Sequence, residues 1–258
     1  MKKLIPILAG TLALCAVSAR AVPELYIHDG GGQLAKVDVP TGTVTAIGAM
    51  GVQMTDIAFD PTGVLYGMSF TGLYTINPLT AAISFIGNHG VAGGNALVFG
   101  SDGTLYAAGS SGILYTLDTG SGASSVVGSM GFASAGDLAF NGGDLYLAST
   151  SNELVKVDVG TGAGSAVGSF GFASVFGLAT ADNGVLYGVS GTTIFAVNTT
   201  TGAGALVSNY GAQGLGASYG SSFYTEAGAS VPDQGNPLGL MAGAAAVLGL
   251  LARRKQDR

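Results

Sequence analysis

Residues 97–128 read LVFGSDGTLYAAGSSGILYTLDTGSGASSVVG and contain one full copy of the unit from which most of this chain is built. Four short apolar segments follow one another, separated by small and turn-forming residues such as Asp102-Gly103. Clusters of Asp, Gly and Ser between β-branched and aromatic segments are typical of tight turns between strands. The stretch is therefore expected to form four short β-strands.

This unit recurs along the chain with a nearly constant period. A Leu-Tyr pair returns at intervals of 40, 40, 40 and 41 residues, and each copy leads to an Asp or Asn that opens a turn, as in Asp38-Val39-Pro40-Thr41-Gly42. Four strands in about 40 residues are typical of a β-propeller blade. The pairs are Leu25-Tyr26, Leu65-Tyr66, Leu105-Tyr106, Leu145-Tyr146 and Leu186-Tyr187, with Phe223-Tyr224 as a sixth, weaker copy.

The most continuously apolar strand of each unit indicates the number of blades. It is expected to be innermost, because a buried strand shows no alternation of polar and apolar residues. It occurs at 57–59, 97–99, 138–140 and 178–179, with a degenerate fifth copy at 215–217. We therefore predict an all-β, five-bladed β-propeller in which residues 214–218 complete the blade that begins at Leu25 and so protect the sheet edges. An open solenoid and a six-bladed ring that borrows strands are the alternatives.

Charged residues are scarce and unevenly distributed. Only 9% of the 258 residues are charged, against about a quarter in an ordinary soluble domain. From Glu24 to Glu226 the chain has 13 carboxylates and two lysines, Lys36 and Lys156, which gives a net charge of −11. Because nucleic-acid binding relies on basic groups that neutralise phosphates, nucleic acid is not expected as a partner.

Residues 1–21 have the three parts of a secretory signal peptide. Lys2-Lys3 precede an apolar run over 4–17, and Ala19-Arg20-Ala21 forms a small-x-small site for signal peptidase before Val22. An uncleaved anchor is the alternative, but the run is shorter than the roughly 20 residues that cross a bilayer. We therefore expect an exported protein with a short N-terminal signal helix.

The only cysteine, Cys15, lies inside this leader. Lipid attachment at Cys15 would also anchor the chain, although Leu14 stands where lipoprotein signals have a small residue. A mature protein that starts at Val22 would contain no thiol, no disulfide and no thiolate metal site.

The C-terminal end is a second membrane-related segment. It reads Val231-Pro232-Asp233-Gln234-Gly235, followed by an apolar stretch over 238–252 and by Arg253-Arg254-Lys255. Fifteen apolar residues would cross only a thin or locally compressed bilayer, with the basic cluster on the cytoplasmic side. This pattern predicts a short apolar helix that acts as a stop-transfer or sorting tail.

Over the last 28 residues the chain resembles the PEP-CTERM class of exosortase-sorted proteins, whose tails have a Val-Pro-Glu-Pro-like motif, a short apolar helix and an Arg-rich end. Val231-Pro232 match that motif, whereas Asp233 replaces Glu and Gln234 replaces Pro, so the motif is closer to the variant Val-Pro-Asp-Ser-Gly. The resemblance implies cleavage near the motif by an exosortase-type enzyme and delivery to the cell surface or extracellular matrix. A plain C-terminal membrane anchor is the alternative.

The chain is thus divided into four parts. We expect a signal peptide at 1–21, a propeller at 22–226, a linker with the sorting motif at 227–237, and an apolar helix with a basic end at 238–258.

The loops that join one blade to the next are expected to lie on one face of the disc. They are rich in glycine and carry the candidate binding residues His89, Phe132, Phe172 and Phe176. An apolar, glycine-rich face is a candidate for binding sugar rings or a partner protein. The alternative is that these side chains fill the interfaces between blades. The other histidine, His28, aligns with Met68, Ala108, Ala148 and Val189, which favours a structural role.

Two carboxylates, Asp56 and Asp137, precede inner strands two blades apart, where Ala96, Gly177 and Gly214 stand in the other units. They are the only candidate ligands for a cation on the axis. Two carboxylates without further oxygen ligands make a weak site, and an Asp that caps a turn explains them as well. No cofactor is predicted.

The favoured hypothesis from the sequence is an exported, non-enzymatic surface or matrix protein. It would bind polysaccharide or neighbouring proteins through the face that carries the loops between blades. A periplasmic or extracellular hydrolase with a metal at Asp56 and Asp137 is the alternative.

Overall fold

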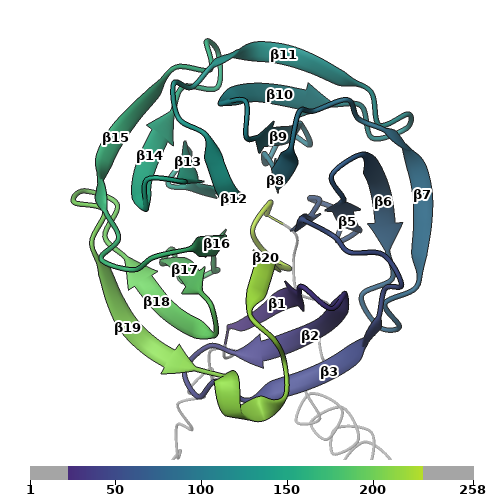
Figure 1. Ribbon diagram of the computed structural model, residues 1–258, viewed down its shortest axis with the longest axis vertical. Coiled ribbons are helices and arrows are strands. Elements are labelled where there is room, and N and C mark those ends of the chain that lie inside the picture. Colours follow the sequence, from purple (N-terminus) through teal and green to yellow (C-terminus); the bar gives the residue numbers. More distant parts are fainter. Residues whose placement is uncertain (1–22, 229–258) are drawn as a thin grey trace, which may run out of the picture.

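A computed structural model describes residues 23–228 of the chain. They form a closed ring of five four-stranded antiparallel sheets around a central axis (Figure 1). The predicted all-β, five-bladed propeller is confirmed. Within 23–228 no helix is both long and apolar enough to cross a membrane. The helices expected at the two ends fall outside these residues.

We label the blades A to E and give their strands from the axis outward. Blade A consists of β20 (Ser218–Phe223), β1 (Glu24–Asp29), β2 (Gln33–Asp38) and β3 (Val44–Ala49). Blade B consists of β4 (Asp56–Phe59), β5 (Leu65–Met68), β6 (Gly72–Ile76) and β7 (Ile83–Asn88). Blade C consists of β8 (Gly94–Phe99), β9 (Leu105–Gly109), β10 (Ile113–Leu117) and β11 (Ser124–Ser129). Blade D consists of β12 (Ser134–Asn141), β13 (Asp144–Ser149), β14 (Glu153–Val157) and β15 (Gly164–Ser169). Blade E consists of β16 (Val175–Thr180), β17 (Leu186–Ser190), β18 (Thr193–Val197) and β19 (Gly204–Asn209).

The antiparallel order gives the disc two different faces. The turns from first to second strand and from third to fourth strand lie on one face, which we call the turn face. The links from second to third strand and from one blade to the next lie on the opposite face, which we call the loop face. The chain enters blade A at Glu24 and leaves it at Phe223, and Leu25 pairs with Phe223, so both ends of the propeller lie on the turn face.

Ring closure occurs by a different strand from the one predicted. Residues 215–217 lie in the loop that follows a short 3-10 helix, η1 (Gly211–Gln213), and the innermost strand of blade A is β20. Phe223 faces Leu25 just as Phe59 faces Leu65, so Phe223-Tyr224 is not a sixth Leu-Tyr strand. The prediction was wrong because β20 has Ser221 and Ser222 where the other innermost strands are apolar.

The turns of the third and fourth strands form as their sequences predict. In the first, Oδ1 of Asp38 accepts hydrogen bonds from the Thr41 amide at 2.9 Å and the Thr41 hydroxyl at 2.6 Å. Gly42 then adopts a φ of 71°, a conformation that costs glycine little because it has no Cβ. Asp118, Asp158 and Asn198 cap the corresponding turns of blades C, D and E.

These turns also interlock the rim of the ring. A Cβ added to Gly87 in β7 would overlap the carbonyl oxygen of Ser121 in the next blade, and one added to Gly128 in β11 would overlap that of Thr161. Each of these outer strands therefore needs a glycine where the turn of its neighbour is packed against it.

Nearer the axis, neighbouring blades meet through aromatic pairs. The Tyr of a Leu-Tyr pair contacts the last Phe of the next blade's innermost strand, with ring centroids 4.9 to 5.8 Å apart, a favourable range for aromatic contacts. The pairs are Tyr26–Phe59, Tyr66–Phe99, Tyr106–Phe140 and Tyr187–Phe223. Thr180 stands in the Phe position between blades D and E.

Candidate functional site

The two carboxylates predicted to precede inner strands are the first residues to consider. Asp56 and Asp137 are both fully buried, and a side-chain hydrogen bond joins them across the axis. In blade A the equivalent residue is Gly220, and not Gly214 as predicted, because β20 is the closing strand. The sequence alone could place these carboxylates on inner strands, but only the ring brings them together.

Both carboxylates accept hydrogen bonds from main-chain amides. Asp56 accepts them from Ile57 at 2.8 Å and from Leu97 of the next blade at 2.6 Å. Asp137 accepts them from Leu138 at 2.7 Å and from Leu178 of the next blade at 2.6 Å. Since the innermost strands present unpaired amides at their inner edges, these carboxylates satisfy donors that the sheets leave free.

The burial of this pair changes its protonation. Desolvation raises the pKa of both carboxyl groups well above the ordinary value, and the proximity of Asp137 raises the pKa of Asp56 further. Two carboxylates in contact cannot both ionise cheaply, so their contact favours protonation of the pair. Within residues 23–228, no three His, Cys, Asp or Glu side chains come together as metal ligands.

A third carboxyl group lies close to the axis on the turn face. Glu226 accepts hydrogen bonds from the Thr180 amide at 3.2 Å and from the Ser222 hydroxyl at 3.0 Å. It thereby links the innermost strand of blade E, β16, to that of blade A, β20. Burial of its carboxyl group raises the pKa of Glu226 to about 8. Its position after the last strand gave no sequence signal for this role.

His28 is buried in the centre of blade A. Its ring nitrogens have no hydrogen-bond partner among the described residues, and desolvation lowers its pKa to about 4. It is therefore neutral, as its alignment with the buried Met68, Ala108, Ala148 and Val189 favours.

His89 belongs to the set of candidate loop residues, and the structure buries it. Its Nε2 lies 2.9 Å from the Ser69 carbonyl oxygen, and its Nδ1 accepts a 3.0 Å hydrogen bond from the Val91 amide. The equivalent residues are also buried in the core: Met50, Met130, Phe170 and Tyr210. The His89 side chain is thus part of the packed interior, and its two hydrogen bonds hold its own loop in place.

Phe132 and Phe172 are half-buried and pack against the cores of blades D and E. The ring of Phe172 stacks on Phe195 at a centroid distance of 4.2 Å and an interplanar angle of 9°. Both side chains therefore contribute to the filling of the blades, whatever their exposed edges contact.

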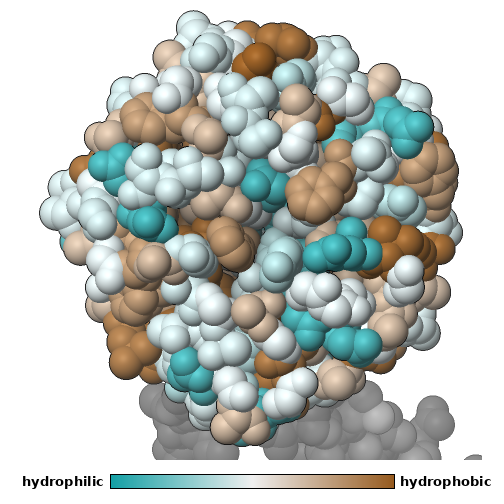
Figure 2. Space-filling view, viewed as in Figure 1, coloured by the Kyte–Doolittle hydropathy of each residue, from teal (hydrophilic) through white to brown (hydrophobic). Residues whose placement is uncertain are grey.

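Phe176 lies on an innermost strand near the loop face and has a partner that sequence reasoning missed. The centroid of Tyr219 in β20 lies 5.9 Å from that of Phe176, and 37% of Tyr219 is exposed. Tyr219 was missed because the closing strand was placed at 215–217. Figure 2 shows that apolar side chains on this view of the disc are dispersed among polar ones, without one dominant patch.

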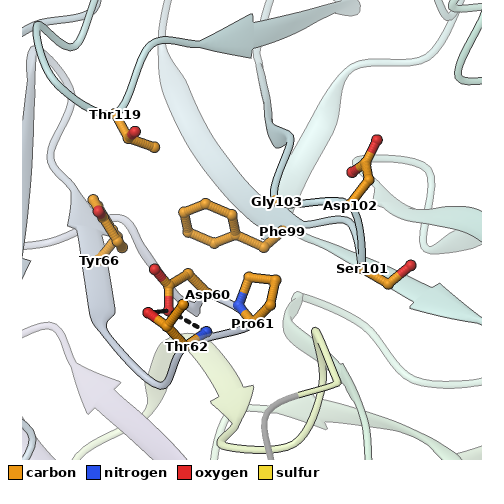
Figure 3. Close-up of a pocket in the computed structure, with 9 residues that line it drawn as sticks. All are labelled: Asp60, Pro61, Thr62, Tyr66, Phe99, Ser101, Asp102, Gly103 and Thr119. Atoms are coloured by element: carbon orange, nitrogen blue, oxygen red, sulfur yellow. Dashed lines mark hydrogen bonds between the residues drawn. The ribbon is translucent and has the colours of Figure 1, made fainter.

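The turn face holds a cavity of about 290 Å³ at the corner between blades B and C, which we call the B/C corner. Figure 3 shows the Phe99 ring in its centre, with Tyr66 on one side and the turn Ser101–Gly103 on the other. Asp60, Pro61, Thr62 and Thr119 complete the lining. The Leu-Tyr and Asp-Gly motifs that build this corner are visible in the sequence, but their contact between two blades is not.

The signal-cleavage residues Ala19, Ala21 and Val22 lie outside the described residues. So do the sorting-motif residues Val231, Pro232, Asp233 and Gly235 and the basic residues Arg253, Arg254 and Lys255. Their predicted roles therefore stay predictions.

The comparisons with known proteins concern only the fold of this chain. No family model and no curated protein matches the chain. A chain of a nidogen/laminin complex superposes with a TM-score of 0.53 at 11% identity, covering 78% of this chain and 98% of that one. A symmetrical protein from a study of de novo evolutionary emergence gives 0.52 at 20% identity, covering 74% and 95%. A Bacteroides thetaiotaomicron protein of unknown function gives 0.52 at 13% identity, covering 71% and 58%. At such low identities these likenesses show the propeller fold and nothing about chemistry.

Proposed function

We propose that this chain is an exported, non-enzymatic protein of the cell surface or extracellular matrix, whose propeller binds polysaccharide or a neighbouring protein through its loop face. The observation that carries the proposal is the burial and hydrogen bonding of Asp56 and Asp137. Their carboxylate oxygens are buried and accept hydrogen bonds from main-chain amides. The side chains best suited to acid–base or metal chemistry thus hold the ring together instead of facing a substrate.

The geometry of the two faces supports the loop face as the binding surface. The chain enters and leaves the propeller on the turn face. The loop face is then directed away from any attachment at either end. It also carries the aromatic pair Phe176–Tyr219, and exposed aromatic rings are a common platform for sugars and protein partners.

Export and sorting rest on the two ends of the sequence. We expect the native protein, recovered from envelope and culture-supernatant fractions, to have an intact mass that lacks residues 1–21 and the region after Val231. A mass that includes the tail to Arg258 would replace sorting with permanent anchoring.

Binding is tested with the full chain on immobilised matrix polysaccharide and matrix protein. Loss of retention in Tyr219→Ser and Phe176→Ser is expected. Leu79→Ser, which changes a residue on the turn face that is 81% exposed, is the matched control. Equal retention of all three variants would exclude the loop face as the binding surface. Turnover of ester, lactone or phosphate substrates that depends on Asp56 would contradict the non-enzymatic role.

A further inference from the structure

The B/C corner has an internal counterpart whose contents are known, namely the A/B corner. Tyr224 follows the innermost strand of blade A, just as Asp60 follows that of blade B. The ring of Tyr224 fills the A/B corner and lies against Phe59, with centroids 5.1 Å apart and an interplanar angle of 61°. The B/C corner has the same Tyr–Phe wall but only the short side chain of Asp60 in that place.

The space around one glycine in each corner shows this difference. A Cβ added to Gly63 at the A/B corner would overlap the hydroxyl of Tyr224. A Cβ added to the equivalent Gly103 at the B/C corner would meet no atom within 4 Å. The cavity of about 290 Å³ therefore occupies the position of a missing six-membered ring, and it lies at the lower end of the usual size of ligand pockets.

The polar groups around the cavity define the chemistry of a suitable ring. Oδ1 of Asp60 accepts hydrogen bonds from the Thr62 amide and the Thr62 hydroxyl, both at 2.8 Å, while no described residue donates a hydrogen bond to its Oδ2. Asp102 accepts the Thr104 amide and hydroxyl, both at 3.0 Å. The Tyr66 and Thr119 side chains hydrogen bond to each other at the edge. An ionised carboxylate can accept hydrogen bonds but cannot donate them, so the corner suits a ring that carries several donors.

The negative charge of the corner further restricts which ligands can bind there. Asp60 and Asp102 both lie in its lining, and each lysine of the described chain is engaged elsewhere, Lys36 with Glu24 and Lys156 with Asp144. A ligand that carries carboxylates would be repelled. The apolar faces of Tyr66, Phe99 and Pro61 can meanwhile contact the C–H face of a sugar.

We propose that the B/C corner binds a pyranose ring without negative charge, as part of a neutral polysaccharide. Ring hydroxyls donate to Asp60 and Asp102, and one face of the ring lies on Tyr66 and Phe99. This site is on the face opposite to the loop face, so it goes beyond the proposed function. A propeller with sugar sites on both faces would cross-link polysaccharide strands.

The experiment measures binding of defined sugars to the full chain by saturation-transfer NMR and calorimetry. The probes are cellohexaose, mannohexaose, glucose and oligogalacturonate. Saturation transfer from at least one neutral hexasaccharide is expected, with weaker transfer from glucose and none from oligogalacturonate at low salt. Absence of transfer from both neutral hexasaccharides at about 10 mM, a concentration that would largely saturate even a site with a Kd of about 1 mM, would overturn the inference.

Two variants close the cavity from opposite blades. Asp60→Tyr introduces the ring that the A/B corner already contains, and Thr119→Trp places a large ring at the other edge. Each is expected to weaken the affinity for the neutral hexasaccharide about tenfold or more, which corresponds to the loss of a buried ring contact. Thr119→Trp leaves the turn cap Asp118 intact, so it tests the site even if Asp60→Tyr folds poorly.

Two further variants separate this inference from the loop-face function. Asp158→Asn changes a turn-capping carboxylate of blade D and should bind the hexasaccharide like the natural protein. Tyr219→Ser should also retain binding at the B/C corner. Binding that Tyr219→Ser abolishes and that both cavity-closing variants keep would overturn the inference and leave the loop-face function standing. Equal binding of oligogalacturonate at low salt would also overturn it.

Discussion

The carboxylate of Asp56 in blade B accepts a 2.6 Å hydrogen bond from the main-chain amide of Leu97 in blade C. Asp137 in blade D makes the same bond to Leu178 in blade E, also at 2.6 Å. Two of the five junctions around the axis are therefore closed by a carboxylate that reaches across to the neighbouring strand. The two carboxyl groups also bond to each other, and Asp137 accepts hydrogen bonds from the Ser221 amide at 3.3 Å and the Ser221 hydroxyl at 3.4 Å in blade A, so the pair connects all five blades.

Removal of one of these carboxylates should destabilise the whole ring. Asp56→Ala leaves the amides of Ile57 and Leu97 buried without a partner, and each such loss costs about 1–3 kcal/mol. We expect the free energy of unfolding in urea to fall by about 2–5 kcal/mol. Asp102→Ala, which removes an exposed turn cap, is the control and should cost about 1 kcal/mol or less. Equal losses for both variants would show that the axial bonds have no special weight.

The stability of the propeller should decrease as the pH rises above about 5. Glu226 has a pKa of about 8 in the folded chain against an ordinary value of 4.5. Between these values the unfolded chain has released a proton that the folded chain retains, so the contribution of Glu226 makes the free energy of unfolding fall with pH until about pH 8. The raised pKa of Asp56 and Asp137 acts in the same direction.

Glu226→Gln should remove a large part of this dependence. The amide oxygen can still accept from the Thr180 amide, and the amide nitrogen can donate to the Ser222 hydroxyl. At pH 9 the variant should be more stable than the natural protein, by up to about 5 kcal/mol since one pKa unit corresponds to about 1.4 kcal/mol. Urea unfolding at pH 5, 7 and 9 measures the effect. Asp158→Asn is the control, because hydrogen bonds from Thr161 lower the pKa of Asp158 and it titrates below this range. An unchanged slope in Glu226→Gln would contradict the prediction.

The interlocked rim predicts a sharp difference between two glycines of neighbouring elements. A methyl group on Gly128 would overlap the Thr161 carbonyl oxygen, whereas one on Gly160 would lie 3.5 Å from the nearest atom, Oδ1 of Asp158. Gly128→Ala should therefore lower the free energy of unfolding by about 1–3 kcal/mol or more, as overpacking does elsewhere. Gly160→Ala should change it by less than about 0.5 kcal/mol. Thermal and urea unfolding of both variants measures the difference. Equal free energies of unfolding would mean that the rim accommodates the methyl group on Gly128 without loss of stability.

Tyr224 should contribute to stability as the ring that fills the A/B corner. Tyr224→Ala loses its contact with Phe59 and opens a cavity, so we expect a loss of about 1–3 kcal/mol. Tyr219→Ala removes a more exposed ring and should cost less than Tyr224→Ala. A loss in Tyr224→Ala no larger than in Tyr219→Ala would show that the A/B corner gains little from its ring. It would then weaken the comparison with the B/C corner.

Much of this architecture could be predicted from the sequence because it depends on local chemistry. The Leu-Tyr pairs, the Asp or Asn caps and the turn glycines such as Gly42 recur every 40 residues, and each sets a strand or a turn within its own blade. A repeat of four strands can bury its apolar faces only against its neighbours, so the period itself indicates a ring of blades. The number of blades followed from counting the innermost strands.

What the sequence could not determine are the contacts between blades, because they join residues that no local pattern relates. The closing strand has serines where its counterparts are apolar, and pairing with β1 places it in the ring despite that composition. The hydrogen bond between Asp56 and Asp137, the burial of the Glu226 carboxyl group and the pairing of Phe176 with Tyr219 all arise where separate blades converge. The B/C corner is the clearest case. Asp60 and Tyr224 occupy equivalent positions in the repeat, yet only packing against the next blade shows that one corner is filled and the other is open.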